Sequence, residues 1–95
     1  MKTYKEAIYK RYVSVHNKSL YGNITLNSIQ NNFALWDHYY GQFLPENKKV
    51  SILDIGCGEG AFVYYLQKKG YTNVSGIDIS EEQIKNGKAL GIHGI

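Results

Sequence analysis

The chain has 95 residues, of which 43% are hydrophobic, so it can form one small domain with a modest core. Its formal net charge of +3 is too mild for a nucleic-acid binder, which would need a clustered basic surface. The single cysteine, Cys57, cannot form an internal disulfide, and no apolar run qualifies as a signal peptide or membrane span. We therefore expect a cytoplasmic protein that binds neither membranes nor, with any strength, nucleic acid.

Residues 1–47 are predicted to form a helical region. Apolar and aromatic residues recur at helical spacing from Tyr4 to about His16, which predicts an amphipathic helix. A second helix is predicted from Asn27 or Ser28, either of which could cap it, to about Phe43. Its inward face is expected to consist of Ile29, Phe33, Trp36, Tyr40 and Phe43.

A short apolar run, Val50 to Ile55, predicts a strand, because it is rich in β-branched residues and too short for a buried helix. Such a strand is expected to be covered on both faces. Gly56, Gly58 and Gly60 then follow at every second position. Without Cβ atoms they can adopt positive φ and approach a ligand closely, whose polar edge would meet free N–H groups at the start of the next helix.

The residues after this glycine loop predict a helix, a strand and another helix. The first helix runs from Ala61 to Lys69, with Gly70 as its cap and Phe62, Val63, Leu66 and Tyr65 as the inward candidates. The strand runs from Asn73 to Asp78. Ser80 and Gln83 form a capping box for the last helix, from Glu81 to about Leu90, with Ile84 inward.

The predicted order of elements is that of a right-handed βαβ unit with the helix that follows it. Residues 91–95 read as the approach to a third strand, and His93 as a linker residue without a role. A doubly wound sheet has more than two strands, and its ligand cleft involves a strand later in the sequence. We therefore expect the chain to be the N-terminal part of a larger protein, truncated before the third strand.

Two motifs resemble those of class I S-adenosylmethionine-dependent methyltransferases. They are Asp54-x-Gly56-x-Gly58-x-Gly60 at the end of the first strand and Gly76-Ile77-Asp78-Ile79-Ser80 at the end of the second. The resemblance covers roughly residues 50–90. It implies an α/β fold, the N-terminal part of a Rossmann-like doubly wound sheet, with residues 48–95 as the first half of the cofactor domain. Residues 1–47 would be lid-type helices, although their aromatic side chains could instead simply pack against the sheet.

The resemblance also implies S-adenosylmethionine as the cofactor. The residues that would bind it are Asp54, Gly56, Cys57, Gly58, Gly60, Asp78 and Ile79. In the family the glycine loop lies under the methionine part, the first acid is near the amino group, and the second acid holds both ribose hydroxyls. A cysteine nucleophile at Cys57 is disfavoured because no activating neighbour is placed for it.

The implied function is methyl transfer to a small-molecule or glycan acceptor by the full-length parent. Residues that contact the acceptor in the family largely follow later strands, so no catalytic residue is assigned here, and no metal ligand either. The motifs specify neither the acceptor nor whether oxygen, nitrogen or carbon is methylated. The isolated chain is expected to be inactive and to associate through its strand edges.

Two other functions remain open. Gly56-x-Gly58-x-x-Ala61, with Asp78 about 20 residues on, also satisfies the fingerprint of an oxidoreductase that binds NAD(P) or FAD. Asp54 and Glu59 argue against it, because two like charges 4 Å apart repel by about 4 kcal/mol at an effective dielectric of 20, and a dinucleotide carries an anionic pyrophosphate. The other alternative is a non-catalytic scaffold that binds S-adenosylmethionine.

Overall fold

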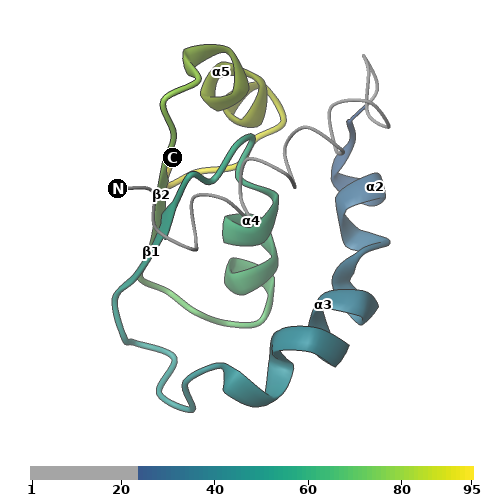
Figure 1. The fold of residues 1–95 in the computed structure, drawn as a ribbon, viewed down its shortest axis with the longest axis vertical. Helices are drawn as coiled ribbons and strands as arrows, with labels where there is room; N and C mark the ends of the chain where they lie inside the picture. The colour runs from purple at the N-terminus through teal and green to yellow at the C-terminus, as the bar shows by residue number, and fades with distance from the viewer. Residues whose placement is uncertain (1–23) are drawn as a thin grey trace, which may run out of the picture.

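The structure is a computed structural model that describes residues 24–95, so the helix predicted between Tyr4 and His16 lies outside it. The elements are α2 (Leu26–Gln30), α3 (Phe33–Tyr40), the 3₁₀ turn η1 (Gly41–Phe43), β1 (Ile52–Ile55), α4 (Ala61–Lys68), β2 (Val74–Ile77) and α5 (Glu81–Ala89). Figure 1 shows the strands on one side of α4 and the pair α2 and α3 on the other. This confirms an α/β arrangement with a small parallel sheet.

The single helix predicted up to Phe43 is wrong, because the helix breaks at Asn31 and Asn32. The Asn32 N–H donates to the carbonyl of Ile29, three residues back, at 3.0 Å. The α-helical hydrogen bond to the residue four positions back is therefore lost there. Two consecutive asparagines favour such a break, since their side chains compete for backbone hydrogen bonds.

The helix also begins earlier than predicted, with Thr25 as its N-cap. Thr25 Oγ1 accepts from the Ser28 N–H at 3.1 Å, and Ser28 Oγ accepts from the Thr25 N–H at 3.0 Å. Ser28 therefore completes a capping box from inside the helix rather than capping it.

The inward face of this region is confirmed in part. Ile29 and Trp36 are buried and Phe33 is half-buried, but Tyr40 and Phe43 are 47% and 75% exposed. The Tyr40 ring still contacts Phe62 of α4, with the two ring centroids 5.5 Å apart. The expectation for Phe43 is wrong because the chain tightens into η1 at Gly41, and a 3₁₀ turn rotates side chains away from the α-helical stripe.

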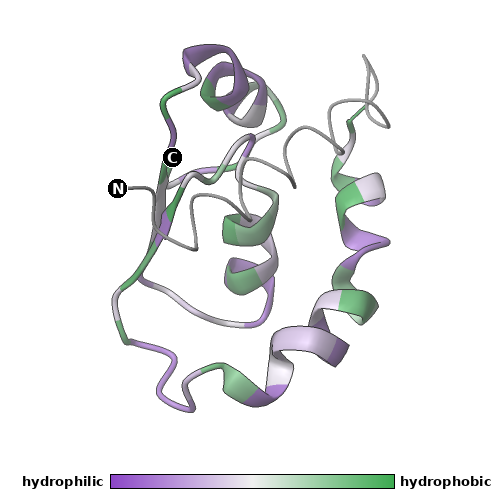
Figure 2. Ribbon diagram, in the orientation of Figure 1, coloured by the Kyte–Doolittle hydropathy of each residue, from purple (hydrophilic) through white to green (hydrophobic). Residues whose placement is uncertain are grey.

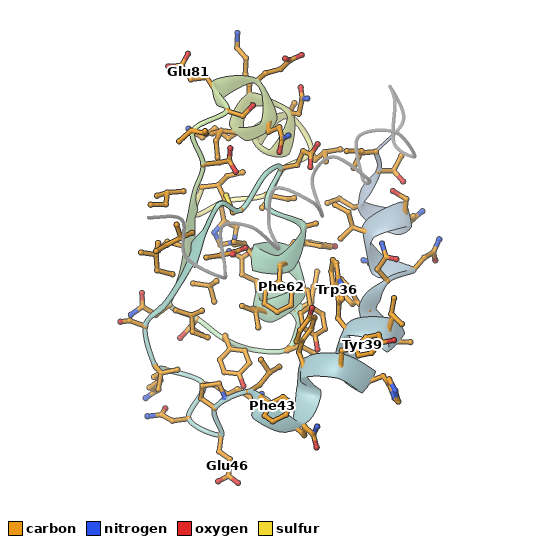
Figure 3. The ribbon with its side chains drawn as sticks, viewed as in Figure 1. Trp36, Tyr39, Phe43, Glu46, Phe62 and Glu81 are labelled. Carbon is orange, nitrogen blue, oxygen red and sulfur yellow. The ribbon has the colours of Figure 1, made fainter. Side chains whose placement is uncertain are left out.

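The core is centred on α4, where Val63, Tyr65 and Leu66 are almost completely buried. Figure 2 shows α4 as largely apolar and α5 as largely polar. The centroid of the Tyr65 ring lies 5.2 Å from that of the Phe33 ring and 5.3 Å from that of the Trp36 ring. Figure 3 shows that Trp36 of α3 also faces Phe62 of α4. Phe33 and Trp36 of α3 thus pack against α4 rather than against the sheet.

Both helices after the glycine loop end at a glycine, which the sequence predicted for Gly70. Gly70 follows α4 with φ of 103° and Gly91 follows α5 with φ of 93°. After each glycine the next N–H, of Tyr71 or Ile92, donates back into the last helical turn at 3.1 Å. These are Schellman motifs, which only glycine adopts without strain.

The two strands are parallel, with Ile52 opposite Val74 and Ile55 opposite Ile77. The face that carries Ile52 and Val74 packs against α4. On the other face Leu53, Ile55 and Ile77 are 52%, 66% and 54% exposed. The expectation of strands covered on both faces is therefore wrong for residues 24–95, because the helices in this range cover one face only.

Residues 91–95 lie beside β2. The Gly76 N–H donates to the carbonyl of Gly94 at 2.8 Å, and Ile92 is 3% exposed. His93 is more than a linker, since its carbonyl accepts from Gln67 Nε2 at 3.0 Å. Among the helices within residues 24–95, none has both the length and the apolar character needed to cross a membrane.

Candidate functional site

The glycine loop between β1 and α4 adopts the backbone that the sequence predicts. Gly56, Gly58 and Gly60 have φ angles of 81°, 60° and 91°, all in the left-handed region. An alanine at any of these positions would be strained, because its Cβ disfavours this conformation. The alternating glycines are therefore required by the path of the loop itself.

Most N–H groups of the loop itself donate to acceptors within the protein. Gly56 and Cys57 both donate to the carbonyl of Ile77, at 2.7 and 2.9 Å, and Gly60 donates to the carbonyl of Cys57 at 2.9 Å. Within residues 24–95 the Glu59 N–H is the one in this loop without such an acceptor. The loop is thus held to the end of β2.

Asp78, directly after β2, connects the loop to the start of α5. Its Oδ2 accepts from the Gly58 N–H at 2.9 Å and its Oδ1 from the Ser80 N–H at 2.7 Å. Ser80 caps α5 as predicted, since its Oγ accepts from the Gln83 N–H at 3.2 Å. The predicted capping box is only half present, because Asp78 takes the Ser80 N–H that the Gln83 side chain would bind.

Two glycines outside the glycine loop allow the surrounding elements to pack closely against it. A Cβ on Gly87 in α5 would lie 2.0 Å from the carbonyl oxygen of Glu59. A Cβ on Gly76 in β2 would lie 2.7 Å from the Cβ of Cys57. The signal for both was available in the sequence, since a glycine inside a helix or strand often marks a close approach.

The remaining predicted site residues lie at the same edge of the sheet. Asp54 is half-buried and stands opposite Gly76 in the strand register. Ile79 is 98% exposed in the turn after β2. The structure therefore brings the loop, both acids and Ile79 together, whereas their contact with a ligand stays a prediction. Residues 24–95 contain no group of three or more His, Cys, Asp or Glu side chains placed to hold a metal ion.

Comparison with known proteins finds similarity in this part of the chain. Residues 46–91 match the family model of a methyltransferase domain. The resemblance to class I S-adenosylmethionine-dependent methyltransferases is thereby confirmed for this segment. No solved structure gave a significant match.

Two curated proteins are similar to the methyltransferase segment. EEF1A lysine methyltransferase 2 of Mus musculus is 51% identical over 36 residues, which cover 38% of this chain and 15% of that protein. Ajmaline N-methyltransferase of Rauvolfia serpentina is 41% identical over 46 residues, which cover 48% of this chain and 16% of that protein. The chain thus spans only about 15% of the length of these relatives.

Within residues 46–91, the side chain of Cys57 is buried under the glycine loop. Its side chain is 7% exposed and lies beside Gly76 and Val63. Burial, the largest cause, and the negative charges of Asp54 and Asp78 raise the pKa of the Cys57 thiol to about 12. A thiol that stays protonated is a poor nucleophile, which supports the interpretation of Cys57 as non-catalytic.

The raised pKa of Cys57 also shows that the glycine loop lies in a negative electrostatic environment. Asp54 precedes the loop, Asp78 binds its middle, and Glu59 within it is 9% exposed. The charges of all three carboxylates raise the pKa of the Cys57 thiol, which means that they disfavour a further negative charge there. A cation is therefore favoured at this loop, and an anion is disfavoured.

Proposed function

We propose that the protein is an S-adenosylmethionine-dependent methyltransferase and that residues 48–95 form the first half of its cofactor-binding, Rossmann-like domain. The observation that carries this proposal is the cluster of three carboxylates, Asp54, Glu59 and Asp78, around a loop of left-handed glycines. S-adenosylmethionine carries a sulfonium and an ammonium group and no phosphate, so its charge suits this loop.

The residues present fit that cofactor. Asp54 would attract the ammonium group, the loop at Gly56 to Gly60 would support the methionine part, and Asp78 would accept from the ribose hydroxyls, as the resemblance implies. The exposed side chain of Ile79 offers an apolar surface beside Asp78. When bound, the cofactor supplies an electrophilic methyl group, and the contribution of these residues is to hold it in a fixed orientation for in-line attack.

The methyl acceptor is proposed to be a small molecule or a glycan, bound by parts of the protein outside this segment. The names of the two relatives give a lysine as the acceptor of one and ajmaline as that of the other. Proteins that share this segment therefore differ in their acceptors. Residues 1–47 remain proposed as lid-type helices, with α2 and α3 packed on α4 as the part that the structure describes.

Ligand-induced thermal shift tests the cofactor assignment. We expect S-adenosylmethionine and S-adenosylhomocysteine to raise the melting temperature of the chain, and NAD, NADP and FAD to leave it unchanged. Asp78→Ala should weaken binding of S-adenosylhomocysteine by about 1.5–3 kcal/mol, the range for hydrogen bonds to a charged group. Asp78→Glu should also bind poorly, because the longer side chain misplaces the same charge.

The thermal shift, together with an assay of methyl transfer, distinguishes the alternative functions. Stabilisation by NAD or FAD in place of S-adenosylhomocysteine would support a dinucleotide-dependent oxidoreductase and contradict the proposal. Binding of S-adenosylmethionine by a full-length protein that transfers no methyl group to any acceptor tested would support a non-catalytic scaffold.

A further inference from the structure

One carboxylate joins the two turns that follow the two strands. The N–H groups that Asp78 binds belong to Gly58, in the loop after β1, and to Ser80, the cap of α5 after β2. Hydrogen bonds to a charged acceptor are roughly twice as strong as those between neutral groups. Asp78 is therefore a strong link between the loop and α5, which also meet at Gly87.

The Gly58 N–H differs from the neighbouring N–H groups of the loop in its acceptor, which is a side chain. Gly56 and Cys57 donate to the carbonyl of Ile77, which belongs to a strand, and Gly60 donates to a carbonyl within the loop. Within residues 24–95 the Gly58 N–H has one acceptor, the side chain of Asp78. The carbonyl of the same peptide group, that of Cys57, accepts from the Gly60 N–H within the loop, so Asp78 supplies the bond that ties this peptide to another element of the fold.

We propose that Asp78 is a positioning residue for the glycine loop, which fixes the Gly58 peptide before any ligand is bound. The resemblance implied a ribose contact alone for Asp78, so this is a second task for the same carboxylate. Only one consequence of this inference, its effect on the affinity for the cofactor, rests on the proposed function. A loop that already has its binding conformation loses less conformational freedom on binding, and the cofactor then binds more tightly.

Amide hydrogen exchange of the ligand-free, full-length chain tests the positioning role. In Asp78→Ala and Asp78→Asn the exchange of the Gly58 N–H should accelerate by about tenfold or more, because a bond to a charged group is lost. The exchange of the Gly56 N–H should stay within about twofold, since its acceptor is unchanged. Glu81→Gln, which removes an exposed carboxylate from the first turn of α5, is the matched control and should change neither.

Unchanged exchange at Gly58, or equal acceleration at Gly56 and Gly58, would overturn the proposal. A second measurement needs no variant. In the wild-type chain a through-hydrogen-bond coupling between the Gly58 nitrogen and the Asp78 side-chain carboxyl carbon should be detectable. Its absence would also overturn the proposal, even if the variants failed to fold.

A ligand experiment separates this inference from the proposed function. The probes are S-adenosylhomocysteine and its 2′,3′-dideoxy analogue, which lacks both ribose hydroxyls. Asp78→Asn should lose affinity for both compounds. Loss for S-adenosylhomocysteine alone would reduce Asp78 to a ribose contact and contradict the positioning role. If the wild type binds neither compound, the cofactor assignment fails while the exchange result still decides the role of Asp78.

Discussion

At the scale of single residues, Gln83 at the start of α5 has a buried side-chain oxygen that the described residues leave without a hydrogen bond. Because Asp78 takes the Ser80 N–H, the side chain of Gln83 loses the partner that a capping box would give it. Its Oε1 is buried and, within residues 24–95, accepts no hydrogen bond. A buried acceptor without a donor costs about 1–3 kcal/mol, so this residue reduces the stability of the chain.

Gln83→Leu is therefore expected to stabilise the ligand-free chain by about 1–3 kcal/mol, measured by urea unfolding. Gln67→Leu is the matched control, because the Gln67 amide donates to the carbonyl of His93 and the same substitution should destabilise. Destabilisation by both substitutions would show that the Gln83 oxygen has a partner after all.

At the scale of elements, the sequence predicted helix ends best where one residue type decides the geometry. Gly70 marked the end of α4 correctly, because a left-handed cap there needs glycine. The break at Asn31 and Asn32 was not predicted, since hydrophobic periodicity continues across it through Ile29 and Phe33. In the site, the sequence predicted the glycine loop, because its backbone conformation needs glycine. It did not predict the hydrogen bonds of Asp78, because they depend on how β1 and β2 pair in space.

The contact between α5 and the glycine loop predicts the outcome of a helix substitution. In an exposed helix Gly→Ala stabilises by about 1 kcal/mol. Gly87→Ala should instead destabilise by about 1–3 kcal/mol, because its Cβ would meet the Glu59 carbonyl and force the backbone to shift. Asn86→Ala, at the exposed neighbouring position, is the control and should be neutral or slightly stabilising in thermal unfolding.

The contact between α3 and α4 predicts a dependence on pH. Hydrogen bonds from Lys69, the larger effect, and from the Tyr65 hydroxyl hold the pKa of Asp37 below its ordinary value of 3.8. Asp37 Oδ1 lies 2.8 Å from Lys69 Nζ and 2.5 Å from the Tyr65 hydroxyl. Because the pKa of Asp37 is lowered in the folded state, its ionised carboxylate stabilises the fold at pH values above the pKa of the unfolded state. This stabilisation is lost as the pH falls through the pKa of the folded state.

Asp37→Asn should therefore flatten the loss of stability on acidification below about pH 4, compared with the wild type. Urea unfolding at a series of pH values measures the difference. Glu46→Gln, which removes another exposed carboxylate, is the control and should leave the wild-type pH dependence in place. An identical acid response of Asp37→Asn and wild type would show that the ion pair contributes nothing to folding.

At the scale of the whole molecule, the described residues leave one face of the sheet without a cover. Leu53, Ile55 and Ile77 lie on this face and are more than half exposed. The edge of β2 is partly occupied, because Gly76 pairs with Gly94, whereas within residues 24–95 β1 pairs with β2 alone. Unpaired edges and clustered exposed apolar residues favour association with other chains.

We expect the isolated 95-residue chain to self-associate through the exposed apolar face of the sheet and the adjoining strand edges, and to transfer no methyl group by itself. Ile55→Lys and Leu53→Lys should shift the chain toward the monomer in size-exclusion chromatography with light scattering, because a charge cannot be buried there without a partner. Leu35→Lys on α3 is the matched control, since Leu35 and Leu53 are both 52% exposed, and it should leave association unchanged. A wild-type chain that stays monomeric at all concentrations, or an equal effect of Leu35→Lys, would contradict association through the sheet.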